Sequence, residues 1–161
     1  MNTKINPIFQ AWKFHRNLAL DILKSINNKQ LQLTVGKNMG TLGQQFRHIV
    51  KIEIEYLEAI KSKKIAPVQE KLDKDLSKSK ELLLRVFEET EKKMTDLLNI
   101  IESEDPERYM IDWTHWGMEA MNLVDHMQAL SDHNNLHNGE IIVYARTHNI
   151  PFPKSWEPWG L

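Results

Sequence analysis

Hydrophobic residues recur every three or four positions along four long segments of the chain, a period typical of amphipathic helices. The segments cover residues 7–26, 41–62, 77–103 and 122–148. Pro7 is tolerated in the first turn of a helix. Thr41 and Gln44 have the spacing of a capping box, in which side chains pair with the free N–H groups of the first turn. Four helices with this period predict an all-α fold, namely an antiparallel four-helix bundle.

An aromatic loop lies in the connection before the last helix. It covers residues 107–118 and contains Tyr109, Trp113, His115 and Trp116. Two interpretations remain open for it: a hydrophobic plug on the end of the bundle, or a lid over a ligand pocket.

The last twelve positions, residues 150–161, differ in composition from the rest of the chain. They contain three prolines and two tryptophans, which predicts an extended tail, not a helix, packed on the bundle. No internal repeat and no second hydrophobic pattern occurs, so residues 1–161 are expected to form a single domain.

Composition narrows the function classes without changing the predicted fold. The chain has 161 residues and a formal net charge of −1 with both signs interspersed, so it has no basic surface for nucleic acid. It has no cysteine, which excludes disulfides, a protein thiolate and cysteine-ligated zinc. No signal-type apolar core or long uncharged apolar run occurs, so we expect a cytoplasmic protein without a membrane partner.

The fourth segment carries three histidines on a stripe that would otherwise be apolar. Its inward positions are His126, Leu130, His133, His137, Ile141 and Tyr144. His133 and His137 are four residues apart, so on a helix their imidazoles project to one side and suit one divalent ion. His126 lies about 10 Å along the axis from His133, too far to join the pair easily, and is interpreted as pocket lining.

A third ligand must come from a facing helix, because two ligands rarely hold a metal ion. His48 in the second segment and His15 in the first both lie on or beside an apolar stripe, and periodicity leaves both candidates open. The stripe of the first segment comprises Ile8, Trp12, His15, Ala19, Ile22 and Ile26. A core or pocket-wall role is therefore the simpler interpretation of His15, and His115 and His148 are expected at the surface or in a lid.

At this point the sequence resembles a known family. The run Leu42-Gly43-Gln44-Gln45-Phe46-Arg47-His48, with His133 and His137-Asn138-Gly139-Glu140, is similar to the DinB-like (DinB/YfiT) family over essentially the whole chain. The resemblance implies a four-helix bundle with a long crossover before the last helix, and it is compatible with a homodimer. It also implies a metal site with one histidine from the second helix and two from the fourth. Carried over to this sequence, the ligands are His48, His133 and His137.

Two residues beside the histidine pair need their own explanation. Gly139 in mid-helix costs about 1 kcal/mol relative to alanine, so we expect a packing or close-approach reason for it. Glu140 departs from the family pattern, which often reads His-Arg-Gly-Gln from His137 onward. Glu140 lies on nearly the same face as His133. It is interpreted as an orienting partner of a ligand imidazole, as a proton acceptor, or as a solvated surface glutamate.

The resemblance also implies a chemistry. Characterised relatives include metal-dependent transferases that attach a low-molecular-weight thiol, such as bacillithiol or mycothiol, to an electrophile. The expected partners are such a thiol and a small-molecule electrophile bound under the Tyr109–Trp116 loop, and a metal-dependent hydrolase is a close variant. The alternative class is a non-catalytic metal-binding bundle that binds a ligand or partner in a stress response. Zinc or nickel is the expected metal, and iron and manganese also accept imidazole ligands.

Overall fold

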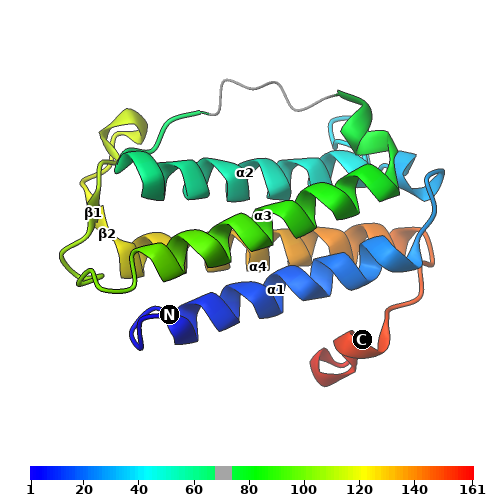
Figure 1. Ribbon diagram of the computed structural model, residues 1–161. Helices are drawn as coiled ribbons and strands as arrows, with labels where there is room; N and C mark the ends of the chain where they lie inside the picture. The colour runs from blue at the N-terminus through cyan, green and yellow to red at the C-terminus, as the bar shows by residue number, and fades with distance from the viewer. Residues whose placement is uncertain (68–73) are drawn as a thin grey trace.

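The computed structural model describes residues 1–67 and 74–161. Its long elements are four helices: α1 (Asn6–Ser25), α2 (Leu42–Ser62), α3 (Lys80–Ile100) and α4 (Leu123–Thr147) (Figure 1). Two short strands, β1 (Met110–Ile111) and β2 (Met121–Asn122), pair antiparallel. Short 3-10 helices cover Gln30–Gln32, Lys74–Lys78, Thr114–Trp116 and Lys154–Trp159. The all-α fold predicted from the periodicity is confirmed.

Side-chain caps set the starts of three helices. At the start of α2 the predicted capping box is present, because Thr41 Oγ1 accepts from the Gln44 N–H at 3.2 Å and Gln44 Oε1 accepts from the Thr41 N–H at 2.8 Å. Asn122 caps α4 by accepting from the Asp125 N–H at 2.9 Å. Ser79 caps α3, which therefore begins at Lys80 and not at the predicted residue 77.

In Figure 1, α1 and α4 run from left to right, whereas α2 and α3 run from right to left. Around the bundle α1 contacts α4, α4 contacts α2, α2 contacts α3, and α3 contacts α1. Phe46 and Phe87, from the first halves of α2 and α3, share one apolar cluster, and Leu57 and Met94, from their second halves, share another. These two helices therefore run parallel, as α1 and α4 do, and the antiparallel neighbours are α2 with α4 and α1 with α3.

The crossover expected before the last helix is wrongly placed. Because α2 and α3 run parallel, the chain passes from one end of the bundle to the other between Ser62 and Lys80 (Figure 1). The connection before α4 stays at one end, because β1 pairs with β2 and the Leu123 N–H bonds the Pro106 carbonyl at 3.0 Å. The family resemblance implied a crossover before the last helix, and the structure has it before α3 instead.

The core consists of two apolar clusters, one toward each end of the bundle. The first contains Phe46, Phe87 and Tyr144, and the second contains Trp12 and Met127. Buried polar side chains from all four helices lie at about mid-height between the clusters: Arg16, Glu53, Thr90 and Asn134. The bundle therefore has a polar layer across its middle, which no sequence stripe had predicted.

The tail differs from its prediction in one respect. Residues 154–159 form a 3-10 helix, so the expectation that no helix could form there is wrong. Pro158 lies inside this short helix. Its ring fixes φ and its nitrogen cannot donate, but a short 3-10 helix tolerates the loss of one backbone hydrogen bond. Trp156 is buried, and its indole N–H donates to the Leu18 carbonyl at 3.1 Å. The tail is thus fastened to α1.

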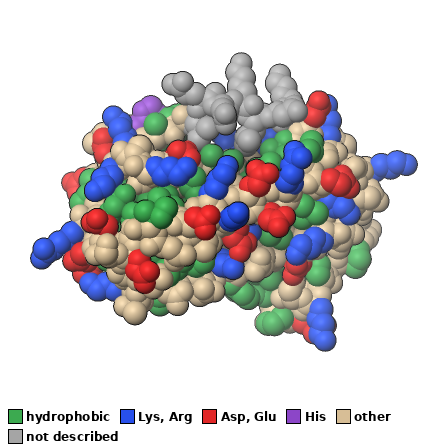
Figure 2. Space-filling model, in the orientation of Figure 1, with side chains coloured by type: hydrophobic (Ala, Val, Ile, Leu, Met, Phe, Trp, Pro, Cys, Tyr) green, Lys and Arg blue, Asp and Glu red, His purple; other side chains and the backbone are tan. Residues whose placement is uncertain are grey.

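The surface shows no segregation of charge on the face seen in Figure 2, where Lys or Arg side chains alternate with Asp or Glu. Within residues 1–67 and 74–161, no helix is both long enough and apolar enough to cross a membrane.

Candidate metal centre

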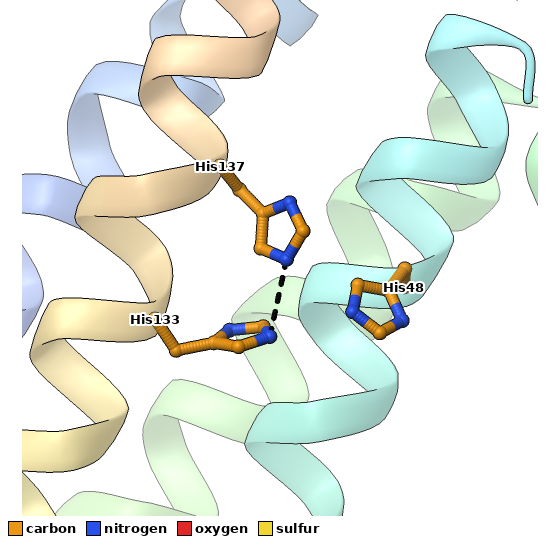
Figure 3. A group of neighbouring side chains, drawn as sticks. All are labelled: His48, His133 and His137. Atoms are coloured by element: carbon orange, nitrogen blue, oxygen red, sulfur yellow. Dashed lines mark hydrogen bonds between the residues drawn. The ribbon is translucent and has the colours of Figure 1, made fainter. Parts of the chain in front are cut away.

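Three histidines from two antiparallel helices converge on one point (Figure 3). His48 lies in the first half of α2, and His133 and His137 lie one turn apart in the middle of α4. Their available ring nitrogens all lie within 4.8 Å of one another, and this is the set of described residues that could hold a metal ion. His137 is buried, His133 is half-buried and His48 is exposed, so the centre has a closed side and an open side.

The geometry fits a divalent ion. The Nε2 atoms of His133 and His137 are 3.1 Å apart. Two nitrogens at the usual Zn–N distance of about 2.0–2.1 Å lie about 2.9–3.4 Å apart for angles between 90° and tetrahedral. The His48 ring lies somewhat farther out on the exposed side, with its centroid 5.3 Å from that of His133 and 4.8 Å from that of His137. The donor set of three imidazoles without carboxylate or thiolate suits zinc, nickel and iron better than the harder manganese ion.

Glu140 braces the buried ligand. Its Oε2 atom lies 2.5 Å from Nδ1 of His137. A carboxylate can only accept here, so the proton is on Nδ1, and the lone pair of Nε2 points toward His48 and His133. Of the interpretations of Glu140 given above, the orienting partner fits this contact, and a free surface glutamate does not. The pairing of a carboxylate with a ligand histidine is common at metal centres.

We expect Glu140→Gln to weaken metal binding by about 10–100-fold, the usual effect of losing such a partner. Glutamine keeps the length of the side chain but lacks the charge that makes the imidazole a stronger donor. Competition with a chelator of known affinity measures the change. Glu157→Gln in the tail is the matched control, and equal affinities of the two variants would exclude the orienting role of Glu140.

Burial favours the neutral form of His133 and of His48. Desolvation lowers the pKa of His133 to about 4, with smaller contributions from His137 and His48. The pKa of His48 is also lowered, first by desolvation and then by the neighbouring His137. A metal ion binds only the unprotonated imidazole. Protons therefore compete little with the metal ion for these two ligands at neutral pH.

The remaining histidines have other partners. His15, the rival third ligand, places Nδ1 3.1 Å from the Ser131 hydroxyl and 3.2 Å from the Ser131 carbonyl oxygen. It therefore belongs to the contact between α1 and α4, as the simpler interpretation held. His148 lies 3.0 Å from the Thr34 carbonyl oxygen, and His115 is exposed in the loop.

The aromatic loop closes the end of the bundle. Trp113 is buried, and its indole N–H donates to Nδ1 of His126 at 3.2 Å, while its ring meets Tyr56 edge to face. His126 lies about 10 Å along α4 from His133. Trp116, by contrast, is 52% exposed. The contacts of Trp113 support the interpretation of the loop as a hydrophobic plug on the end of the bundle.

His126 makes the folded protein sensitive to acid. Its Nδ1 accepts from Trp113 and its Nε2–H donates to the Tyr56 carbonyl at 3.1 Å, so neither nitrogen can take a further proton without losing a bond. Burial lowers the pKa of His126 to about 4. An unfolded histidine titrates near 6.5. The unfolded state therefore binds more protons between these values, and stability is complete above pH 6.5 and falls as pH drops toward 4.

Between pH 7 and 4 we expect the free energy of unfolding to fall by up to about 3 kcal/mol less in His126→Gln than in the wild-type protein. Glutamine retains hydrogen-bonding groups but does not titrate. Urea unfolding at a series of pH values from 7 to 4 measures the slope, with exposed His115→Gln as the control. If the wild-type protein and His126→Gln lose stability in parallel over this range, His126 is not the sensor.

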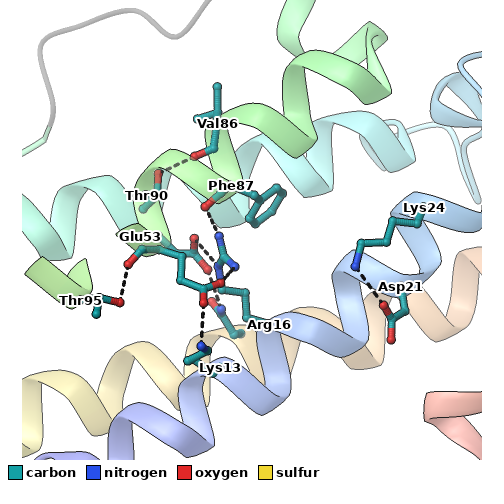
Figure 4. A network of polar contacts seen from close by, with 11 residues as sticks. Lys13, Arg16, Asp21, Lys24, Glu53, Val86, Phe87, Thr90 and Thr95 are labelled. Atoms are coloured by element: carbon teal, nitrogen blue, oxygen red, sulfur yellow. Dashed lines mark hydrogen bonds and ion pairs between the residues drawn. The ribbon is translucent and has the colours of Figure 1, made fainter. Parts of the chain in front are cut away.

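A buried charge network next to the triad was missed in the sequence. Arg16 is 1% exposed and Glu53 is 0% exposed. The Arg16 guanidinium bonds Glu53 at 3.2 Å and Glu91 at 2.6 Å, and it also donates to the Phe87 carbonyl (Figure 4). Asn134, the neighbour of His133, donates to Glu53 at 2.9 Å. Glu53 occupies the buried stripe Phe46-Val50-Glu53-Leu57, and a carboxylate at such a position was the signal available.

The fold and the site together define a class: four-helix bundles with a histidine triad shared by the second and fourth helices. The family model of the DinB family matches residues 1–148, and the chain belongs to the DinB family. Among solved structures it is similar to a DinB-like protein, YjoA, from Bacillus subtilis, with a TM-score of 0.70 and 19% identity over 92% of this chain and 97% of that chain. At this identity the likeness shows the fold. No curated protein matches the sequence.

Proposed function

We propose that this protein is a metal-dependent enzyme that transfers a low-molecular-weight thiol, of the bacillithiol kind, to a small electrophile at the His48, His133 and His137 site. The observation that carries the proposal is the asymmetry of the triad. His137 is buried and braced by Glu140, whereas His48 is exposed at the rim. Three protein ligands with an open side are typical of catalytic metal sites, while structural sites are closed by a fourth ligand.

A divalent ion held by these imidazoles would supply a Lewis acid that lowers the pKa of a thiol or of water. In the proposed transfer the sulfur forms a bond to the electrophilic carbon, the bond from that carbon to its leaving group breaks with both electrons, and the thiol proton is released. The chain has no cysteine, so the sulfur comes from the cosubstrate.

The contact of Glu140 favours transfer over hydrolysis. Hydrolysis calls for a base that takes a proton from water. The Glu140 carboxylate already accepts from His137 at 2.5 Å, which suits it to hold the imidazole in place. The exposed rim beside His48 also replaces the aromatic loop as the proposed place of the electrophile, because the loop contacts the bundle end near His126.

Two measurements test the proposal. Metal analysis of the purified protein comes first, and we expect close to one divalent ion per chain. The loaded protein is then mixed with bacillithiol and monobromobimane, and formation of the thioether is followed by fluorescence. We expect a rate above background that His48→Ala abolishes and His115→Ala leaves unchanged. A bound metal without thiol binding or transfer would favour the non-catalytic metal-binding bundle. Metal-dependent cleavage of a separately added ester to its acid and alcohol, without thioether formation, would favour the hydrolase.

A further inference from the structure

A pocket lies on the face of α4 that points away from the histidine triad. It has a volume of about 350 Å³ and opens between α4, α1 and the tail. Its α4 wall includes Asn135, Gly139, Ile142 and Arg146. Successive residues of a helix are rotated by about 100°, so Gly139 lies roughly 200° around α4 from His137. The pocket is therefore separate from the metal centre, and its size is within the range of small-molecule sites.

The backbone is bare at the middle of this wall. A Cβ atom added to Gly139 would meet nothing within 4 Å. Among the residues that the structure describes, the packing or close-approach reason expected for this mid-helix glycine is therefore not found. A glycine destabilises a helix interior relative to alanine, and the absence of a side chain here leaves open space inside the pocket. Glycine commonly serves where a ligand must approach the backbone closely.

Two tryptophans of the tail form the opposite wall. Trp156 is held in place by its indole hydrogen bond to the Leu18 carbonyl. Trp159 is 53% exposed, and its ring stacks on Phe14 with ring centroids 6.3 Å apart. Both residues follow position 148, where the match to the DinB family ends. This wall is therefore supplied by a segment outside the part of the chain that matches the family.

A single positive charge stands at the pocket. Arg146 is exposed near the end of α4 and lines the pocket. Across residues 1–67 and 74–161, the Arg146 guanidinium has no ion pair and no hydrogen bond, whereas Arg16, Arg85 and Arg108 are each paired with an acid. A guanidinium binds a carboxylate through two parallel hydrogen bonds. The exposed Asn135 also lines the pocket, about three turns of α4 before Arg146.

From these features we infer a binding site for a small aromatic carboxylate between α4 and the tail. The flat ring lies between the bare backbone at Gly139 and the Trp156 and Trp159 side chains, with Ile142 as an apolar floor. The carboxylate pairs with Arg146. Aromatic walls and one placed cation are the usual composition of a small-molecule site. The inference does not depend on the metal or on thiol transfer.

The test compares phenylacetate with the uncharged phenylacetamide on the full chain. Tryptophan indole N–H signals are followed by ¹H–¹⁵N NMR and assigned with Trp156→Phe and Trp159→Phe. We expect phenylacetate to shift both signals saturably and to bind about tenfold more tightly than the amide, as one charge-assisted contact allows. Arg146→Met should reduce phenylacetate affinity about tenfold and leave the amide unchanged. Arg85→Met, on the exposed face of α3, is the matched control.

Gly139→Leu tests the site independently, because the leucine side chain would fill the pocket. The variant should fold, since position 139 is exposed and leucine favours helix more than glycine does. We expect it to abolish the shifts by both compounds with an unchanged circular dichroism spectrum. Absence of shifts in the wild-type protein at about 10 mM ligand, a concentration that reveals even millimolar affinities, would overturn the site. Equal binding of acid and amide, or full retention of affinity in Arg146→Met, would overturn the assignment of a carboxylate.

Discussion

Replacing Arg16 with methionine lowers the free energy of unfolding by about 3–5 kcal/mol, the usual loss when one partner of a buried ion pair is removed. The side chain is buried against the rings of Trp12 and Phe87, and methionine preserves much of that apolar contact. Glu53, however, would remain fully buried without its cation. Desolvation already raises the pKa of Glu53 in the folded protein, and the charge of Arg16 opposes that rise. Urea unfolding at pH 7 measures the loss.

The double variant Arg16→Met/Glu53→Leu separates a lost charge pair from lost packing. With both charges absent, no buried charge is left uncompensated, and we expect most of the stability to return, less the cost of the Asn134 amide, which loses its acceptor. Arg85→Met serves as a control, because that arginine is 66% exposed and lies 4.0 Å from Glu89. We expect its effect to stay within about 0.5 kcal/mol. If the double variant is as unstable as Arg16→Met alone, the loss arises from packing and not from the buried carboxylate.

Replacing His48 with alanine weakens metal binding by more than about 100-fold, beyond the range expected for a partner of a ligand. Only His133 and His137 would then remain, and two ligands rarely hold an ion. The site lies on the surface side of α2, so the substitution leaves the apolar clusters intact. Chelator competition measures affinity, and the rise in melting temperature on adding zinc provides a second readout, because a ligand stabilises the state that binds it.

His15→Ala is the informative comparison, since His15 was the rival ligand on periodicity alone. It contacts Ser131, and we expect a loss of stability in that variant without a change in metal affinity. Full retention of metal by His48→Ala, with loss in His15→Ala, would replace the triad by one that includes α1. Loss of metal in both variants would show that the α1 contact also shapes the centre.

The sequence predicted the helices well because their signals are local. The capping box at Thr41 and the cap at Asn122 depend on contacts within one turn, and periodicity marks each apolar face. Helix direction is a different matter. Nothing local distinguishes a crossover from a compact turn, so the parallel pairing of α2 with α3 could be seen only in the folded chain.

For the histidine triad, too, the local spacing was predictable and the contact between helices was not. The i, i+4 spacing of His133 and His137 was readable, but the choice between His48 and His15 needed the family resemblance. The buried pair of Arg16 and Glu53 was not predicted, because a charged residue on a helix is usually exposed to solvent. Each lies in fact three or four residues from large apolar neighbours on its own helix, and only the pairing across helices explains how either can be buried.

The polar layer at mid-height has a consequence for the alignment of the helices. Apolar faces rich in leucine and isoleucine are interchangeable from turn to turn, so sliding one helix by about 5.4 Å would still pair apolar with apolar. Such a slip would take Glu53 away from both Arg16 and Asn134 and leave its charge buried alone. The layer thus selects one register among several of similar hydrophobic content. In that register His48 faces His133 and His137, so the buried charges of Arg16 and Glu53 also specify where the exposed imidazole of the triad stands.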